Sequence, residues 1–226
     1  MVTGWLVATL LFAVADWGAV ATGRTRVRYG TKPATLLALI AWFGQIGGWQ
    51  PSLIWFGLAL VCSWFGDVFL LQIDRFFVPG LVSFFAAHVC YLIGFSLSPP
   101  ELTWAAAIFL VLVVIAYGLV FPRILLAVQR NPKTALLRAP VILYGLVITL
   151  MFYSALLNLL RPGWPRQAAL LTGVGAGLFF LSDSLLATNR FCRPFRFGEL
   201  GVIVTYHLGQ LALIWGVLLR FSTPAF

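Results

Sequence analysis

Long apolar stretches occupy almost the whole chain and leave little room for any other kind of structure. Reading runs of about 17 to 25 mostly apolar residues as membrane-crossing helices predicts eight of them. Their expected ranges are 3–21, 33–49, 52–71, 76–97, 102–121, 139–160, 167–187 and 200–219. With 62% hydrophobic and 9% charged residues, the chain is too apolar for a soluble domain that must cover itself with polar surface. We therefore expect an all-α, polytopic membrane helical bundle that forms one transmembrane domain over residues 1–226.

The basic residues predict the orientation of this bundle. A net charge of +9 could suggest nucleic-acid binding, but the basic side chains fall in short connections between the predicted helices. Twelve of the 15 Lys and Arg residues lie in the odd-numbered connections, namely Arg24, Arg26, Arg28, Lys32, Arg75, Arg123, Arg130, Lys133, Arg138, Arg190, Arg193 and Arg196. Because cytoplasmic connections carry an excess of such residues, we expect these connections in the cytoplasm and both termini outside. The expected surroundings are membrane lipids, with no nucleic-acid partner.

The excess of arginine over lysine, 13 to 2, is weakly typical of a GC-rich bacterial genome. It therefore favours the cell membrane, in a bacterium the inner membrane, as the location of the protein. The sequence does not predict an oligomeric state.

Two aspartates lie inside predicted apolar helices. Asp67 comes four residues before the expected inner end of the helix over 52–71, and Asp183 comes four before that of the helix over 167–187. At about 1.5 Å per residue, both carboxyls are expected roughly 6 Å below the inner boundary, at one depth. A carboxylate is costly in hydrocarbon and usually marks a site, although a structural partner is the alternative. For Asp16, at a similar depth beside an arginine-rich connection, the structural interpretation is equally open.

Further polar side chains are expected near these acids. Tyr206 and Gln210 are four residues apart and share one face of their helix. His88 and Tyr91 are expected deeper, near the midplane, and Lys32 stands at the inner entrance of the second helix. Each has a structural alternative, which is an interhelical hydrogen bond for the uncharged side chains and snorkelling to the interface for Lys32. Together they predict a pocket in the cytoplasmic half of the bundle.

No signature of a metal or cofactor accompanies these residues. The two histidines lack the spacing of HExxH, and no glycine-rich phosphate loop follows a strand. The three cysteines show no CxxC or paired spacing, so no disulfide framework is indicated. We expect no cofactor and no metal ligands, while a water-mediated metal between the aspartates stays open.

Prolines and glycines are expected to mark the ends of the helices. Pro33 is expected to open the second helix, and Pro79, Pro99–Pro100 and Pro122 to lie at later helix ends. The basic stretch over 122–138 would then lie along the inner membrane surface, beside anionic lipid headgroups, or it would serve only as a topology signal.

Several short segments in order along the chain carry a family resemblance. They are Lys32-Pro33, Gly66-Asp67 with Leu70-Leu71, Gly80-Leu81, Phe84, His88 to Tyr91, Gly94-Phe95, the stretch 175–191 with Leu181-Ser182-Asp183-Ser184-Leu185-Leu186-Ala187, and Tyr206 with Gln210. Together they resemble the YhhN-like lysoplasmalogenase family of eight-helix membrane proteins. The resemblance implies a lysophospholipid substrate and hydrolysis of the vinyl ether bond of lysoplasmalogens. The products would be a fatty aldehyde and glycerophospho-ethanolamine or -choline.

Two carboxyl groups suit that reaction on chemical grounds. Acid hydrolysis of a vinyl ether begins with protonation of the alkene carbon, and water captures the resulting oxocarbenium ion. One protonated acid and one carboxylate suffice, as in glycosidases. We therefore expect Asp67 and Asp183 to be the catalytic pair, with no prediction of which one donates the proton.

The remaining polar residues are expected to bind the substrate. His88, Tyr91, Tyr206 and Gln210 would hold water or the glycerol hydroxyl. Lys32 and Arg190, with the neighbouring Asn189, would hold the phosphate at the entrance. The alkenyl chain would lie among phenylalanines, namely Phe65, Phe69, Phe84, Phe179 and Phe180, which core packing or lipid contact explains equally well.

Two other functions use the same residues. Membrane carboxylates with a histidine also form proton relays, which is typical of a proton-coupled transporter. Transporters tend to place the site near the midplane in interrupted helices, whereas these acids are expected near one face. A non-catalytic lipid-binding protein, whose polar groups only join helices, is the third possibility.

Overall fold

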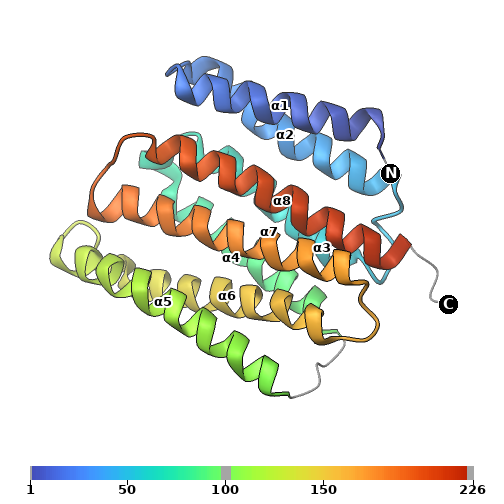
Figure 1. Cartoon of the computed structure of the whole chain (residues 1–226). Helices are drawn as coiled ribbons and strands as arrows, with labels where there is room; N and C mark the ends of the chain where they lie inside the picture. Colours follow the sequence, from blue (N-terminus) through green and yellow to red (C-terminus); the bar gives the residue numbers. More distant parts are fainter. Residues whose placement is uncertain (1, 98–102, 223–226) are drawn as a thin grey trace.

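The computed structural model describes residues 2–97 and 103–222, which form an all-α bundle (Figure 1). Within those residues there are eight α-helices and no β-strand. The helices are α1 (Gly4–Ala21), α2 (Thr25–Gln45), α3 (Ile54–Leu70), α4 (Ile73–Ser96), α5 (Trp104–Arg130), α6 (Arg138–Leu157), α7 (Arg166–Ala187) and α8 (Gly198–Ser222). Short 3₁₀ turns flank α6 at η1 (Ala135–Leu137) and η2 (Asn158–Leu160), and a π-helical turn, η3 (Thr188–Cys192), follows α7. The predicted all-α class and the number of helices agree with this architecture.

Six segments in the described part of the chain are long and apolar enough to cross a membrane. They are Gly4–Ala21, Ile73–Ser96, Trp104–Arg130, Ala135–Leu160, Arg166–Cys192 and Gly198–Phe221. α3 is apolar but has 17 residues, and α2 begins with a basic stretch. Large apolar side chains are exposed on the outside of the bundle, for example Leu112 and Leu119 of α5. An outer surface this apolar suits lipid rather than water, and the chain is therefore a multi-pass membrane protein.

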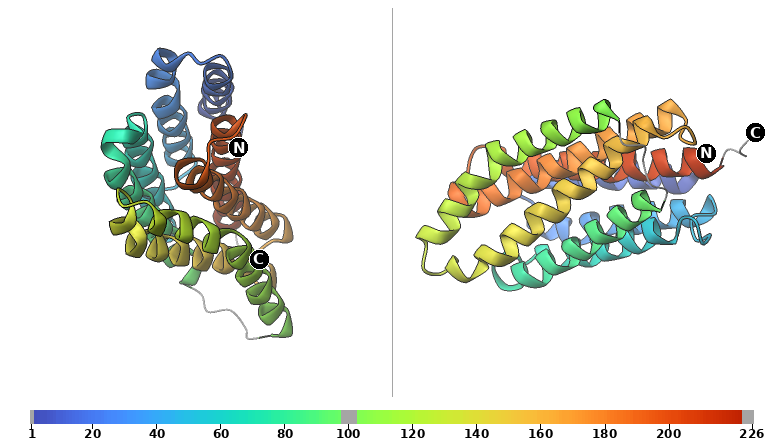
Figure 2. Two further views of the ribbon diagram at one scale, coloured as in Figure 1. Left: turned by 90° about the vertical axis from the view of Figure 1, so that its left-hand side faces the viewer. Right: turned by 90° about the horizontal axis from the view of Figure 1, so that it is seen from below.

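The helices surround a common centre. In the end view of Figure 2 (left), α3 and α4 lie on the side opposite α7 and α8, with α1 and α2 at one edge and α5 and α6 at the other. The connections that follow α1, α3, α5 and α7 lie at one end of the bundle, and the start of α1 and the end of α8 lie at the other (Figure 1). We call the first end the basic end because it carries the twelve Lys and Arg residues of the odd-numbered connections.

Three of the prolines that were expected at helix ends lie inside helices, which corrects that expectation. Pro33 lies within α2, Pro79 within α4 and Pro122 within α5. As a result α2 begins at Thr25 rather than at residue 33, and α5 continues to Arg130. Much of the stretch 122–138 is therefore helix rather than a surface connection. Membrane helices tolerate proline because neighbouring helices and polar side chains satisfy the freed backbone groups.

Pro79 leaves a visible mark on α4. Phe76 departs from helical geometry, with φ −118° and ψ 26°, where the helix is kinked. A proline ring clashes with the carbonyl four residues earlier, here that of Arg75, and removes one backbone hydrogen bond. The first turn of α4 is therefore set at an angle to the rest of the helix. The expected break at Pro99–Pro100 lies outside the described residues.

Aromatic packing joins three helices in the middle of the bundle. The ring of Phe179 on α7 lies 4.6 Å from the ring of His88 on α4 and 5.3 Å from that of Tyr206 on α8, measured between centroids. The ring of Phe84 on α4 meets both Phe179 and Tyr206 edge-on. Because aromatic pairs prefer such geometry, this cluster orients the polar ends of His88 and Tyr206.

Glycines bring α7 and α8 into backbone contact. A Cβ added at Gly175 would lie 2.6 Å from the backbone nitrogen of Leu213, and one added at Gly216 would lie 2.7 Å from the carbonyl oxygen of Ala168. Small residues at such positions are typical of tightly packed membrane helices. The two helices therefore lie closer than side chains would permit.

Candidate active site

A cavity of about 420 Å³ lies at the basic end of the bundle. Residues of α2, α3, α4, α7, η3 and α8 line it, so it lies among the helix pairs seen end-on in Figure 2. Its polar lining consists of Thr25, Arg28, Lys32, Asp67, Ser182, Asp183, Asn189, Arg190, Glu199 and Tyr206. Three cations and three carboxylates thus face one space inside an otherwise apolar bundle. Such a convergence is typical of a binding or catalytic site.

Asp67 is buried in the cavity lining and is held by two side chains. Lys32 Nζ on α2 lies 3.1 Å from Asp67 Oδ1, and the Tyr206 hydroxyl on α8 donates a hydrogen bond to Oδ2 at 2.8 Å. A buried ion pair needs additional hydrogen bonds to offset its desolvation, and Tyr206 supplies one. We call Lys32, Asp67 and Tyr206 the ion-pair centre.

Asp183 reaches the same cavity with different partners. The Tyr144 hydroxyl on α6 donates a hydrogen bond to Asp183 Oδ2, and His88 Nε2 on α4 lies 3.1 Å from both that oxygen and the Tyr144 hydroxyl. These contacts all use Oδ2, and within the described residues Oδ1 makes no hydrogen bond. We call His88, Tyr144 and Asp183 the hydrogen-bond centre, and its carboxyl keeps one oxygen available to a ligand.

The two centres are separate but open on one space. Within the described residues no hydrogen bond or ion pair joins Asp67 to Asp183, while both carboxyls line the same cavity. The pairing expected from the sequence thus takes the form of two carboxyls that face a shared volume, each with its own partners.

The two arginines of the lining are more exposed than its two aspartates and lie nearer the mouth. Arg190 Nη1 pairs with Asp74 Oδ1 at 2.6 Å, and Arg28 Nη1 pairs with Glu199 Oε2 at 3.1 Å. With Lys32 they give the cavity three positive groups that a phosphate could meet. The sequence predicted Lys32 and Arg190 for this role and missed Arg28.

The other predicted binding residues lie in three different settings. Asn189 lines the cavity, where its side-chain oxygen accepts a hydrogen bond from the backbone nitrogen of Phe195 at 3.2 Å. Tyr91 donates to Gln210 Oε1 at 2.6 Å, and both are buried outside the lining. His88 is also outside the lining and reaches the cavity only through Asp183. The structure therefore brings Asn189 to the site but keeps the Tyr91–Gln210 pair away from it.

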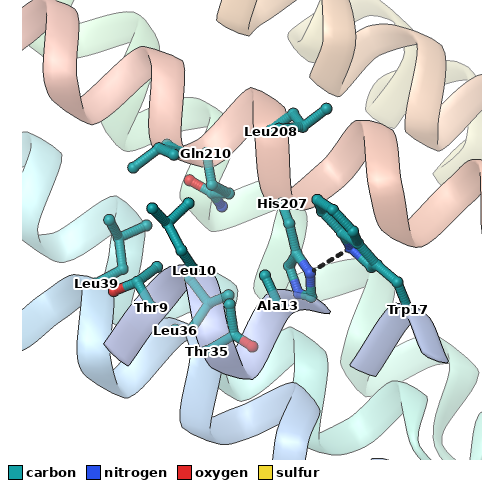
Figure 3. Close-up of a pocket in the computed structure, with 11 residues that line it drawn as sticks. Thr9, Leu10, Ala13, Trp17, Thr35, Leu36, Leu39, His207, Leu208 and Gln210 are labelled. Atoms are coloured by element: carbon teal, nitrogen blue, oxygen red, sulfur yellow. Dashed lines mark hydrogen bonds between the residues drawn. The ribbon is translucent and has the colours of Figure 1, made fainter. Parts of the chain in front are cut away.

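Gln210 lines a second, much smaller cavity between α1, α2 and α8 (Figure 3). Its volume is about 10 Å³, close to the minimum for one water molecule. His207 lies beside it, and its Nδ1 accepts a hydrogen bond from Trp17 Nε1 at 3.1 Å. The Trp17–His207 contact joins α1 to α8, which agrees with the structural role expected for polar residues between membrane helices.

An apolar extension adjoins the hydrogen-bond centre. A cavity of about 40 Å³ shares Leu70, Phe84, Asp183 and Leu186 with the larger one. Its remaining lining is apolar except for the edge of Tyr144, and it consists of Phe77, Leu81, Phe121, Val141, Ala187 and Phe191. Of the phenylalanines expected to hold a lipid chain, Phe84 lies here, whereas Phe65 is exposed on the outside.

Tyr144 and Glu199 are the contributors that sequence reasoning missed most clearly. Tyr144 is one of two tyrosines in the apolar helix α6 and resembles many interfacial or core tyrosines in sequence. Glu199 opens α8, where a carboxylate commonly interacts with the helix dipole. A search for every polar residue in the apolar helices would have selected Tyr144. Among the described residues, no group of three or more His, Cys, Asp and Glu side chains could hold a metal ion.

Comparison with known proteins gives one consistent result. The sequence profile of the YhhN family matches residues 27–217. A human protein named lysoplasmalogenase TMEM86B is 33% identical over 183 residues, which cover 80% of this chain and 70% of the human one. A rat protein of the same name is 32% identical over 80% of this chain and 68% of its own, and a bovine lysoplasmalogenase TMEM86A is 28% identical over 73% and 65%. No solved structure matches the chain.

Proposed function

This chain belongs to the YhhN family, and on that premise we propose that it hydrolyses the vinyl ether bond of a lysoplasmalogen. The products are a fatty aldehyde and a glycerophospho-alcohol. Relatives of about 30% identity carry the name lysoplasmalogenase, which supports a hydrolase acting on ether bonds. The observation that carries the proposal is the single cavity in which two carboxyls, three cations and an apolar extension converge.

The shape of the site supports one placement of the substrate. The carbons of the alkenyl chain next to the vinyl ether lie at the apolar extension beside Phe84, whose volume of about 40 Å³ holds only a short part of the chain. The vinyl ether then lies next to Asp183. The phosphate then points to the mouth, where Arg28, Lys32 and Arg190 supply positive charge. This placement brings the reacting bond to the carboxyls and keeps the headgroup at the entrance.

Asp183 is the proton donor in this proposal. Its Oδ2 is held by Tyr144 and His88, while Oδ1 is available to the cavity. The proton on Oδ1 moves to the alkenyl carbon that is not bonded to oxygen. The C=C electrons form the new C–H bond, and the neighbouring carbon and ether oxygen share the positive charge of an oxocarbenium ion.

Asp67 is the base that completes the reaction. A carboxylate has about four lone-pair positions, so Asp67 can accept a proton from water while Lys32 and Tyr206 hold it in place. Water adds to the oxocarbenium carbon and gives its proton to Asp67, which produces a hemiacetal. The hemiacetal hydroxyl then returns a proton to Asp183 as its C=O bond forms. The departing glycerol oxygen takes the proton from Asp67, and both carboxyls regain their starting forms.

The location of the site follows from the charge distribution. Twelve of the 15 Lys and Arg residues lie at the basic end, which the excess of positive charge in cytoplasmic connections assigns to the cytoplasm. On this basis all eight helices cross the cell membrane, in a bacterium the inner membrane, and both termini lie outside. The cavity then opens toward the cytoplasmic half of the bilayer, where lysophospholipids of the inner leaflet can enter.

The test is product analysis with the purified protein. Lysophospholipids with an alkenyl, alkyl or acyl chain are incubated in D₂O, and products are identified by mass spectrometry. We expect aldehyde from the alkenyl form alone, with one deuterium on the carbon next to the carbonyl. Release of fatty acid from the acyl form would instead indicate an ordinary lysophospholipase. Uptake of the intact lipid into proteoliposomes without any product would favour a transporter.

A further inference from the structure

The cavity lining carries an ion pair of which the proposed function uses only the arginine, so that its glutamate has no role yet. Arg28 of α2 donates from Nη1 to Glu199 Oε2 of α8 at 3.1 Å, and both side chains line the cavity. The pair joins two helices at the place where a ligand must enter. A headgroup in the cavity therefore has to lie against it or exchange partners with it.

Charged groups of the cavity change sign with depth. The exposed fraction of the side chain is 1% for Asp67, 7% for Lys32, 12% for Asp183, 23% for Arg28, 32% for Arg190 and 69% for Glu199. The order from the inside outward is thus carboxyls with Lys32, then two arginines, then one carboxylate. A zwitterionic lysophospholipid has the matching order, with its reacting bond innermost, its phosphate in the middle and its ammonium group outermost.

Resting on the proposed function, we propose that Glu199 binds the ammonium group of a zwitterionic lysophospholipid headgroup while Arg28 and Lys32 hold its phosphate. The Arg28–Glu199 pair presents the same two opposite charges as the headgroup. Binding exchanges both partners, so that Arg28 turns to the phosphate and Glu199 to the ammonium. Arg28 Nε also lies 4.0 Å from Asp16 Oδ1, so a second carboxylate stays near the arginine during the exchange.

An anionic headgroup has no ammonium group to pair with Glu199. A phosphoglycerol headgroup can satisfy Arg28, but it leaves the Glu199 carboxylate facing a negative group without a countercharge. Specificity often depends on such a repulsive contact with the wrong ligand. The site therefore selects against anionic lysophospholipids.

Glu199 also has a structural role that the test must separate from this one. It lies in the first turn of α8, where a carboxylate stabilises the helix through the dipole. Loss of that role would weaken the binding of every ligand equally. The informative quantity is consequently the ratio of two dissociation constants rather than either one alone.

The experiment measures binding to the full chain in nanodiscs. The probes are two lysophospholipids with an alkyl ether chain, which cannot undergo vinyl ether hydrolysis, and with either a phosphoethanolamine or a phosphoglycerol headgroup. We expect the wild type to prefer phosphoethanolamine, and Glu199→Gln to reduce that preference about fivefold, the upper range for an exposed ion pair. Glu199→Asp keeps the charge and should retain most of the preference. Asp74→Asn is the matched control, because Asp74 lies at the same end, is paired with an arginine and does not line the cavity.

Two results would overturn the headgroup site. One is an equal preference of the wild type for the two headgroups, or no binding of either. The other is an equal weakening of both probes by Glu199→Gln. Because neither probe is hydrolysed, intact headgroup selectivity together with no aldehyde release from alkenyl substrates would overturn the proposed function and still support the site.

Discussion

The ion-pair centre and the hydrogen-bond centre place the same functional group, a carboxyl, in one cavity by different physical means. The Asp67 carboxylate is paired with the positive charge of Lys32, so the two side chains together carry no net charge. Asp183 contacts His88 and Tyr144, which supply hydrogen bonds without a permanent countercharge. Two identical side chains can hold different protonation states when their surroundings differ in this way. In the proposed reaction, this contrast is the reason for giving the role of base to Asp67 and that of acid to Asp183.

The largest effect expected from breaking this contrast is on turnover at the hydrogen-bond centre. Asp183→Asn removes the acidic proton but keeps an oxygen that can accept the Tyr144 hydrogen bond. We expect kcat for aldehyde release to fall about 10³-fold, the usual range for loss of a general acid. The melting temperature should change little, since the packing around residue 183 is preserved. Full activity in this variant would remove Asp183 from the mechanism.

The next largest effect is expected at the ion-pair centre, where one substitution should lower both stability and turnover. Asp67→Asn leaves Lys32 buried without its countercharge, and we expect a loss of about 3 kcal/mol in the free energy of unfolding. Aldehyde release should fall about 10²-fold because the base is absent. Thermal denaturation and a rate assay on the same preparation measure the two effects.

The control for Asp67→Asn is the double variant Lys32→Met with Asp67→Leu. It removes both charges, so the melting temperature should recover toward that of the wild type while activity stays low. Recovery of activity along with stability would show that Asp67 acts only as a structural partner of Lys32.

The smallest effect is expected outside both centres. Tyr91→Phe removes the hydrogen bond to Gln210, which lies away from the cavity lining. We expect about 1 kcal/mol lower stability, the usual worth of one such bond, and unchanged kcat and KM. A tenfold rise in KM would instead show that Tyr91 contributes to substrate binding, as the sequence predicted.

Hydropathy predicted the all-α class and a total of eight helices because a lipid-facing helix must be apolar along its whole length. Of the eight predicted membrane crossings, six fall on segments of the described residues that are long and apolar enough to span. The rule that proline marks a helix end failed in the membrane environment. Proline usually ends or kinks a helix in a soluble protein, yet Pro122 lies within the continuous helix α5. Proline placement alone therefore gives poor helix ends in such a chain.

The candidate site could be predicted in part for a related reason. Asp67 and Asp183 were found because a carboxylate in an apolar helix is conspicuous. His88 was expected deeper than the acids, but its Nε2 lies 3.1 Å from Asp183. Counting a fixed rise from an assumed helix end neglects the kink at Phe76 and the extension of α7 into η3. Tyr144 was missed because its partner comes from another helix, which one sequence does not reveal.

The glycine contact between α7 and α8 has a mechanical consequence. Because their backbones are in contact, α7 and α8 are expected to move as one rigid unit that carries Asp183 on α7 and Tyr206 on α8. If the cavity widens to admit a lipid, the movement is then expected in the facing helices α3 and α4, which carry Asp67 and His88. A displacement of α3 and α4 away from α7 and α8 would therefore lengthen the Tyr206–Asp67 and His88–Asp183 contacts together.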